Sequence, residues 1–234
     1  MNPISAVMPA RDPSVLKHAF ATCCGLAIAL LGAPACVAAF RLATGESHAD
    51  LQVVGREISL FLLATTLVWI VKTQEQLPLT SIGVHVDRLG RSLMRGAVLG
   101  IVLLGVTVGL YLLLPKMGLH VGDSGRGSFH PSLWVTALVV LRAGVVEELF
   151  YRGFAIERLT SFSGNTVLAS SLPLVFFAAA HYRQGLGGVV AAATLGGLLS
   201  IFYLKYRDLI ANMAAHFLVD FVLNIGIPLV TNSR

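Results

Sequence analysis

The sequence predicts an all-α membrane protein with about seven transmembrane helices packed in one bundle. Of the 234 residues, 56% are hydrophobic and only 12% are charged, whereas an ordinary soluble domain has about 25% charged residues. The mean hydropathy of +0.79 agrees with this composition. Apolar runs of about 20 residues, the length that crosses a bilayer as a helix, recur along the chain. We therefore expect an integral membrane protein embedded in the lipid bilayer.

Three apolar runs lie in the N-terminal half of the chain. The first follows a polar stretch over residues 1–17 and contains Cys23, Cys24 and Cys36. Their spacing fits no zinc motif, so we interpret the cysteines as packing residues. The second run is followed by a polar, turn-rich stretch over residues 73–92, which suits a short interfacial segment. The three predicted spans cover about residues 19–40, 53–72 and 93–115.

Four more spans are predicted after a glycine-rich polar loop over residues 118–132. The first of them is longer than a simple span, so we expect it to leave the membrane or to bend near Gly153. Glycine pairs at residues 187–188 and 196–197 would let neighbouring helices approach closely. These four spans cover about residues 131–159, 166–182, 186–204 and 208–230.

The runs divide the chain into three regions: an N-terminal transmembrane region over residues 1–130, a core over residues 131–226 and a tail over residues 227–234. Lys and Arg are unequally distributed between the segments that flank the predicted spans. One side holds Arg11, Lys17, Lys72, Arg88, Arg91, Arg95, Arg152, Arg158, Lys205 and Arg207, and the other holds Arg41, Arg56, Lys116, Arg126, Arg183 and Arg234. The richer side marks the cytoplasm, which predicts a cytoplasmic N-terminus. No basic stripe is interleaved with aromatic residues, so we expect no nucleic-acid partner.

Two adjacent acids, Glu147 and Glu148, lie inside the hydrophobic stretch LWVTALVVLRAGVVEELFYRGF. Burial of a carboxylate in hydrocarbon is costly, so a chain that buries two is expected to use their charge or their protons. Glu148 and Arg152 are four residues apart and share a helical face, where they can form an ion pair. Glu147 points about 100° away around the helix and is free to face a cavity. The alternative is that both acids are solvated at a helix end.

Later helices add three more ionisable residues. His181 ends the run SLPLVFFAAAH, one turn after Phe177, and His216 shares a helical face with Asp220. Taken singly, His181 could be an interfacial residue, and His216 with Asp220 could be a polar pair that helps helices pack. Ionisable residues inside spans usually face the interior of the bundle. Taken together, the groups on three helices could therefore build a water-activating site.

In such a site, Glu147 suits a general base that shares a water molecule with His181. His216 could donate to an oxyanion while Asp220 orients its ring. Glu147, His181 and His216 could also bind a zinc ion with an open water position, so the cofactor is either none or a divalent metal. The sequence contains no G-x-S-x-G elbow, no H-E-x-x-H motif and no phosphate-binding loop.

Three motifs, in their order and spacing, resemble those of a known family. EELFYR (147–152) matches E-E-x-x-x-R, FAAAH (177–181) matches F-x-x-x-H, and HFLVD (216–220) matches H-x-x-x-N/D after the approach RDLI (207–210). This pattern is similar to that of the CAAX protease and bacteriocin-processing family, also called the Abi family. Its eukaryotic relatives are type II CAAX prenyl endopeptidases. The resemblance covers about residues 131–226.

The resemblance implies an all-helical intramembrane endopeptidase that acts on a membrane-associated protein or peptide in a bacterial inner (plasma) membrane. The catalytic residues would be Glu147, His181, His216 and Asp220, and the supporting residues Glu148, Arg152 and Phe177. One departure concerns position 220, where the type II enzymes have Asn. An ionised Asp cannot donate to an oxyanion, so Asp220 is protonated, orients His216 or binds a metal. The family is discussed both as metalloproteases and as metal-free glutamate proteases, and the sequence is compatible with either.

Two other functions fit part of the pattern. Buried acids and histidines also form the proton relays of transporters, although the sequence shows no inverted repeat. Bacterial family members are linked to bacteriocin self-immunity, so a non-catalytic immunity or scaffold protein is a further alternative. Full function in a Glu147→Gln variant would favour binding over catalysis.

Overall fold

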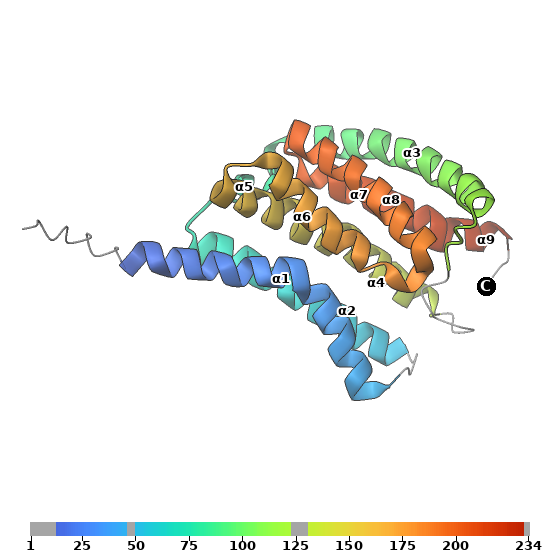
Figure 1. The fold of residues 1–234 in the computed structure, drawn as a ribbon, viewed down its shortest axis with the longest axis horizontal. Helices are drawn as coiled ribbons and strands as arrows, with labels where there is room; N and C mark the ends of the chain where they lie inside the picture. Colours follow the sequence, from blue (N-terminus) through green and yellow to red (C-terminus); the bar gives the residue numbers. More distant parts are fainter. Residues whose placement is uncertain (1–12, 46–49, 123–130, 232–234) are drawn as a thin grey trace, which may run out of the picture.

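The computed structural model describes residues 13–45, 50–122 and 131–231. These residues are almost entirely helical, and no strand occurs among them (Figure 1). The prediction of an all-α protein is therefore confirmed. Most of the polar N-terminal stretch, the centre of the glycine-rich loop and the end of the tail lie outside the described residues.

In the N-terminal half, two helices pack against each other and a third lies on the other side of the molecule (Figure 1). The elements are α1 (Pro13–Thr44), α2 (Asp50–Trp69) with its π-helical continuation η1 (Ile70–Gln74), the 3-10 helices η2 (Leu79–Ile82) and η3 (Val86–Arg88), α3 (Leu89–Leu113) and η4 (Leu114–Met117). α1 contains Pro34, and neighbouring helices can make a proline tolerable inside a membrane helix. α3 packs along α8, which belongs to the C-terminal half.

The C-terminal half begins with one continuous helical rod made of four segments. The rod consists of α4 (Leu133–Arg142), the π-helical η5 (Ala143–Glu147) and η6 (Leu149–Ile156), and α5 (Glu157–Ser163). It is followed by α6 (Thr166–Ala179), η7 (Tyr182–Gln184), α7 (Gly185–Tyr206), α8 (Leu209–Phe221), η8 (Val222–Gly226) and α9 (Ile227–Thr231). These bounds lie within a few residues of the predicted helices.

Among the described residues, five helical stretches are long and apolar enough to cross a membrane, so the chain is an integral membrane protein. They are His18–Thr44, Asp50–Gln74, Val86–Met117, Tyr182–Tyr206 and Leu209–Thr231. The predicted number of about seven is not confirmed. α6 has only 14 residues, and at 1.5 Å per residue it is about 21 Å long, against a hydrocarbon core of about 30 Å. The rod carries Arg142 together with the two acids, which interrupts its apolar character.

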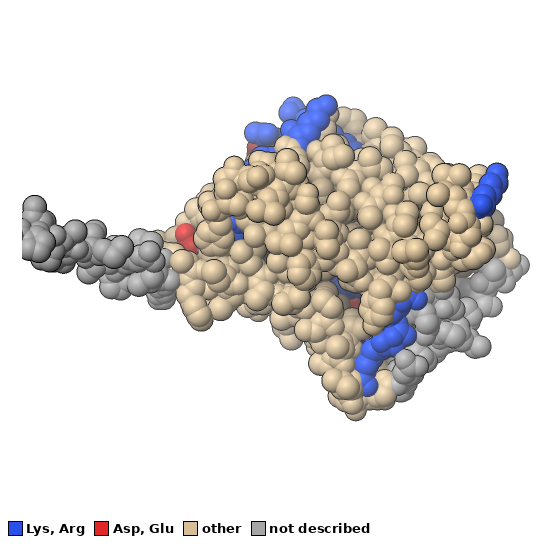
Figure 2. Space-filling view, in the orientation of Figure 1, with Lys and Arg blue, Asp and Glu red and all other residues tan. Residues whose placement is uncertain are grey.

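The surface agrees with a membrane environment. Figure 2 shows a face on which uncharged atoms predominate and on which Lys and Arg gather at a few places, mostly along the outline. Many large apolar side chains are exposed, among them Ile101 of α3 and Ile201 of α7. Exposed apolar side chains are stable in contact with lipid tails, which explains how five long helices can present them outward.

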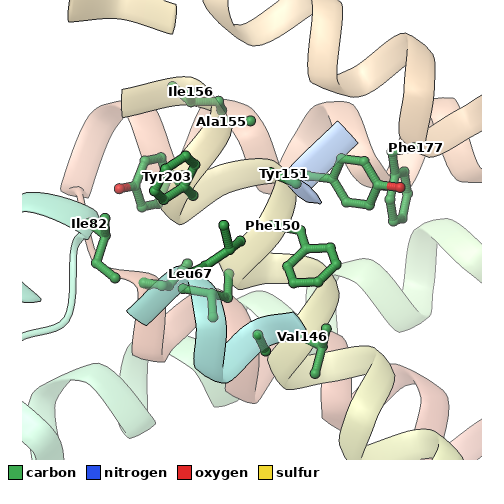
Figure 3. Close-up of a cluster of buried hydrophobic side chains, with 14 of the residues drawn as sticks. Leu67, Ile82, Val146, Phe150, Tyr151, Ala155, Ile156, Phe177 and Tyr203 are labelled. Atoms are coloured by element: carbon green, nitrogen blue, oxygen red, sulfur yellow. The ribbon is translucent and has the colours of Figure 1, made fainter. Parts of the chain in front are cut away.

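The rod is the centre of the fold. Every residue of η6 is buried, and a cluster of apolar side chains from α2, η2, α6 and α7 surrounds it (Figure 3). The members labelled in Figure 3 are Leu67, Ile82, Val146, Phe150, Tyr151, Ala155, Ile156, Phe177 and Tyr203. Charged side chains of the rod consequently need their partners inside the protein.

The start of α8 is anchored by Asp208, which belongs to the predicted RDLI approach. Its Oδ1 accepts a hydrogen bond from the backbone N–H of Ala211 at 3.1 Å and so caps the helix. Its Oδ2 accepts a hydrogen bond from the hydroxyl of Ser92 at 2.9 Å and lies 3.4 Å from a guanidinium nitrogen of Arg95. These contacts join α8 to α3 and thereby set the position of His216 along the bundle.

Candidate active site

The two acids lie where the two π-helical segments of the rod meet. η5 ends at Glu147 and η6 begins at Leu149, with Glu148 between them. Such π-helical turns, with hydrogen bonds from residue i to i+5, often occur at functional sites. The rod approaches the backbone of α8 closely at Gly144, where an added Cβ would lie 2.9 Å from the backbone nitrogen of Phe217. The absence of a side chain at Gly144 thus brings the acids next to α8.

Glu148 is completely buried and is bound by three side chains. Its Oε1 accepts a hydrogen bond from Nη1 of Arg152 at 2.7 Å and lies 2.8 Å from Nδ1 of His216. Its Oε2 accepts a hydrogen bond from Nδ2 of Asn212 at 3.1 Å. A carboxylate that binds a guanidinium accepts hydrogen bonds, so Nδ1 of His216 is the donor in that contact. The predicted ion pair with Arg152 is present, and two groups of α8 complete it.

Arg152 is equally buried, and its remaining donors also have partners. Nη2 donates to the carbonyl of Gly196 at 2.9 Å, and Nε donates to the hydroxyl of Ser200 at 3.3 Å. The guanidinium carbon lies 4.5 Å from the ring centroid of Phe177, a cation–π geometry. An added Cβ at Gly196 would lie 2.9 Å from Nη2 and 2.8 Å from the Phe177 ring, so the glycine makes room for both.

His181 lies just after the end of α6, and its ring is held from its own helix. Nδ1 is 2.8 Å from the carbonyl oxygen of Phe177. A carbonyl only accepts hydrogen bonds, so Nδ1 donates and the neutral ring keeps the lone pair on Nε2. The ring centroids of Phe177 and His181 are 4.9 Å apart. This arrangement leaves Nε2 as the nitrogen that can accept a proton.

His216 lies between two carboxylates. Its Nδ1 donates to Glu148, whereas its Nε2 is 3.6 Å from Oδ2 of Asp220. A distance of 3.6 Å is too long for a hydrogen bond but short enough for an ion pair when the ring is charged. The ring is therefore held mainly by Glu148. Asp220, which the sequence analysis suggested as the residue that orients the ring, makes only the longer contact.

The predicted catalytic residues line one cavity of about 840 Å³. Glu147, His181, His216 and Asp220 all contribute to its wall. Much of the remaining wall is apolar and includes Leu103, Val108, Leu195, Leu199 and Val219. A cavity of this size, with apolar walls and a few converging polar groups, is typical of a site for a small molecule or a short peptide segment.

Glu147 has a partner that the sequence analysis did not include. Nη1 of Arg142 forms an ion pair with Oε1 of Glu147, and Nε of the same arginine forms an ion pair with Oε2 of Glu57 in α2. Oε1 of Glu57 in turn binds Nη2 of Arg56 at 2.6 Å. A charged residue inside an apolar run was the available signal for Glu57 and Arg142. Asn212 was also missed, although it lies one turn before His216.

The described side chains do not form a ready-made metal site. Within residues 13–45, 50–122 and 131–231, no three His, Cys, Asp or Glu side chains are grouped as a metal ion would need. The possible ligand set of Glu147, His181 and His216 is thus not assembled around a common point. Nδ1 of each histidine is already engaged, by a carbonyl in one case and by a carboxylate in the other.

The comparison with protein families agrees with the motifs. Residues 129–222 match the model of a family described as Type II CAAX prenyl endopeptidase Rce1-like. No curated protein and no solved structure matches the chain. The matched segment contains the rod, α6, α7 and the whole of α8, and it leaves α1, α2 and α3 outside. This match agrees with the family predicted from the three motifs, and over residues 129–222 the chain is similar to the type II CAAX prenyl endopeptidases.

Proposed function

We propose that the protein is an intramembrane endopeptidase that hydrolyses a peptide bond of a membrane-associated protein or peptide with an activated water molecule. The main support is the convergence of Glu147, His181, His216 and Asp220 on one cavity. These residues come from the rod, the end of α6 and α8, which are separate in sequence. The family match supports the same type of activity, because the matched family is one of proteases.

In the proposed reaction, a water molecule lies between the carboxylate of Glu147 and Nε2 of His181. Glu147 takes a proton while the water oxygen attacks the carbonyl carbon of the substrate. The C–N bond then breaks, and the proton held by Glu147 passes to the leaving nitrogen. One water molecule is consumed, and a new carboxyl end and a new amino end are formed. No metal ion is needed for these steps.

His216 is proposed to stabilise the oxyanion that forms on the substrate carbonyl. Because Nδ1 donates to Glu148, a second donor on Nε2 requires the imidazolium form of the ring. The carboxylates of Glu148 and Asp220 lie at the two ends of the ring and balance this charge. This gives an ionised Asp220 a function, since it supports the donor instead of donating itself.

The cavity suggests an apolar substrate segment. Leucine and valine side chains of α3, α7 and α8 form much of its wall, and such a wall binds apolar chains. The description of the matched family names a CAAX prenyl endopeptidase. We therefore propose a peptide with a lipid-modified cysteine near its C-terminus as the first substrate to test. A bacterial inner membrane is the proposed location, and the Lys and Arg distribution supports a cytoplasmic N-terminus there.

The test compares cleavage of a library of membrane-associated peptides by the purified protein in lipid nanodiscs, with products identified by mass spectrometry. Wild type is expected to cleave at least one peptide, and Glu147→Gln and His181→Ala are expected to lose at least about 10²-fold in rate. Asp87→Asn is the matched control, because Asp87 is an exposed acid paired with Arg88 away from the cavity. Equal cleavage by wild type and both site variants would contradict the proposal.

A further inference from the structure

Four charged side chains form a continuous chain between α2 and the rod. Arg56 binds Oε1 of Glu57 through Nε and Nη2 at 2.8 and 2.6 Å. Arg142 binds the other oxygen of Glu57 through Nε and binds Glu147 through Nη1. Positive and negative groups alternate along the chain, so its members balance one another. Glu57 thus connects the proposed catalytic acid to a helix that lies outside the matched family segment.

The two ends of this chain of charges are more exposed to solvent than its centre. The side chain of Glu57 is 0% exposed and that of Arg142 is 11% exposed, whereas Glu147 and Arg56 at the two ends are 18% and 30% exposed. A completely buried carboxylate is stable only when its charge is compensated. Arg142 is therefore held in place by Glu57, and Arg56, Arg142 and Glu147 all reach the wall of the cavity.

The π-helical segment η5 explains why Arg142 can reach Glu147. In an α-helix, residues five positions apart point about 140° away from each other, since each residue turns by about 100°. In a π-helix the hydrogen bonds run from residue i to i+5, so residues five positions apart lie on one face. η5 spans Ala143–Glu147 and brings the arginine just before it onto the face of its last residue.

We infer that Glu57 and Arg142 are positioning residues for Glu147, so that α2 supplies part of the active site. Arg142 binds Oε1 of Glu147 and holds the carboxylate against the cavity wall, which leaves Oε2 to take the proton from water. Glu57 fixes the guanidinium from the opposite side. This inference rests on the proposed function for its effect on turnover, whereas the position of Glu147 can be tested without any substrate.

The experiment uses the full chain in lipid nanodiscs and the double variant Glu57→Gln/Arg142→Gln, which removes one negative and one positive charge together. Two quantities are measured. The first is the kcat and KM of peptide cleavage. The second is the labelling of the Glu147 carboxyl by a water-soluble carbodiimide, located by mass spectrometry. Arg142→Lys keeps the positive charge but lacks the forked guanidinium. Arg88→Gln is the control, because Arg88 is an exposed arginine that pairs with Asp87 away from the cavity.

The double variant is expected to lose about 10²-fold in kcat, because a displaced catalytic group costs about that much, while KM stays within about threefold. Labelling of Glu147 should rise at least about fivefold, since a carboxylate released from its guanidinium reacts more readily. Arg142→Lys should recover at least about a tenth of the wild-type kcat. Arg88→Gln should match wild type in both measurements.

Wild-type kcat or wild-type labelling in the double variant would overturn the inference. Should the double variant fail to fold, Arg142→Lys and Glu57→Asp decide the question by labelling, and unchanged labelling in both would overturn it. If wild type cleaves no peptide, the proposed function fails, and the labelling result still decides whether Glu57 and Arg142 position Glu147.

Discussion

Nδ1 of His216 lies 2.8 Å from Oε1 of Glu148, the same oxygen that accepts a hydrogen bond from Arg152. One buried carboxylate therefore holds an arginine of its own rod and a histidine of α8. Its neighbour Glu147 lines the cavity and is bound through Arg142. The two adjacent acids consequently have different tasks, and the same substitution should affect them differently.

We expect Glu148→Gln to destabilise the fold by about 3–5 kcal/mol, because it leaves Arg152 buried without a negative partner. Glu147→Gln should destabilise it less, since Arg142 keeps its ion pair with Glu57. The free energies of unfolding can be compared by denaturant titration in the same detergent. Equal losses for the two variants would contradict this difference in tasks.

Substitution of Asp220 should separate charge from hydrogen bonding. Asp220→Ala removes the group 3.6 Å from Nε2 of His216 and is expected to lower kcat by about 10²–10³-fold, as loss of an oxyanion-stabilising group does. Asp220→Asn should keep at least about a tenth of the wild-type kcat, because an amide can donate to the oxyanion directly. Rates of peptide cleavage measure both effects. An Asn variant as inactive as the Ala variant would show that an amide at position 220 does not donate to the oxyanion.

Gly144→Ala should weaken the contact between η5 and α8. The added Cβ would meet the backbone of Phe217 at 2.9 Å, and backbone atoms cannot move aside as a flexible side chain can. We expect a loss of about 1–3 kcal/mol in stability together with reduced cleavage. Gly105→Ala in α3 is the matched control, since no atom lies within 4 Å of the added Cβ there. A Gly144→Ala variant as stable and active as this control would disprove the close approach.

Cleavage is expected to continue after exhaustive treatment with a chelator. The described side chains gather no set of three suitable metal ligands, and the proposed steps use Glu147 and His181 alone to activate water. The measurement is the cleavage rate after chelation, followed by metal analysis of the purified protein. Loss of activity that a divalent metal restores would show that the side chains rearrange around an ion.

Much of the fold follows from local sequence patterns. Apolar runs predicted the helices to within a few residues, because a bilayer accepts only backbone whose hydrogen bonds are satisfied within the segment. The spacing of four residues predicted the contact between Glu148 and Arg152, which depends on one helix alone. The number of spans was less predictable, since α6 is shorter than the bilayer and the rod carries six charged residues.

Contacts between different helices could not be predicted from local sequence patterns. His216 and Glu148 are 68 residues apart, and their meeting depends on the rotation of α8 relative to the rod, which no single run determines. The ion pair of Arg142 with Glu147 was missed for a different reason: a spacing of five suggests no contact when 3.6 residues per turn are assumed. Glu57 belongs to a helix outside the motifs, so only the packed structure connects it to the site.

The π-helical turn of η5 also affects how related chains should be aligned. Compared with an α-helix, such a turn contains one additional residue, which corresponds to a one-residue insertion in the sequence. In a chain with an uninterrupted α-helix, the arginine equivalent to Arg142 would stand four positions before the first acid instead of five. An alignment without a gap would place the two arginines in different columns and hide their equivalence.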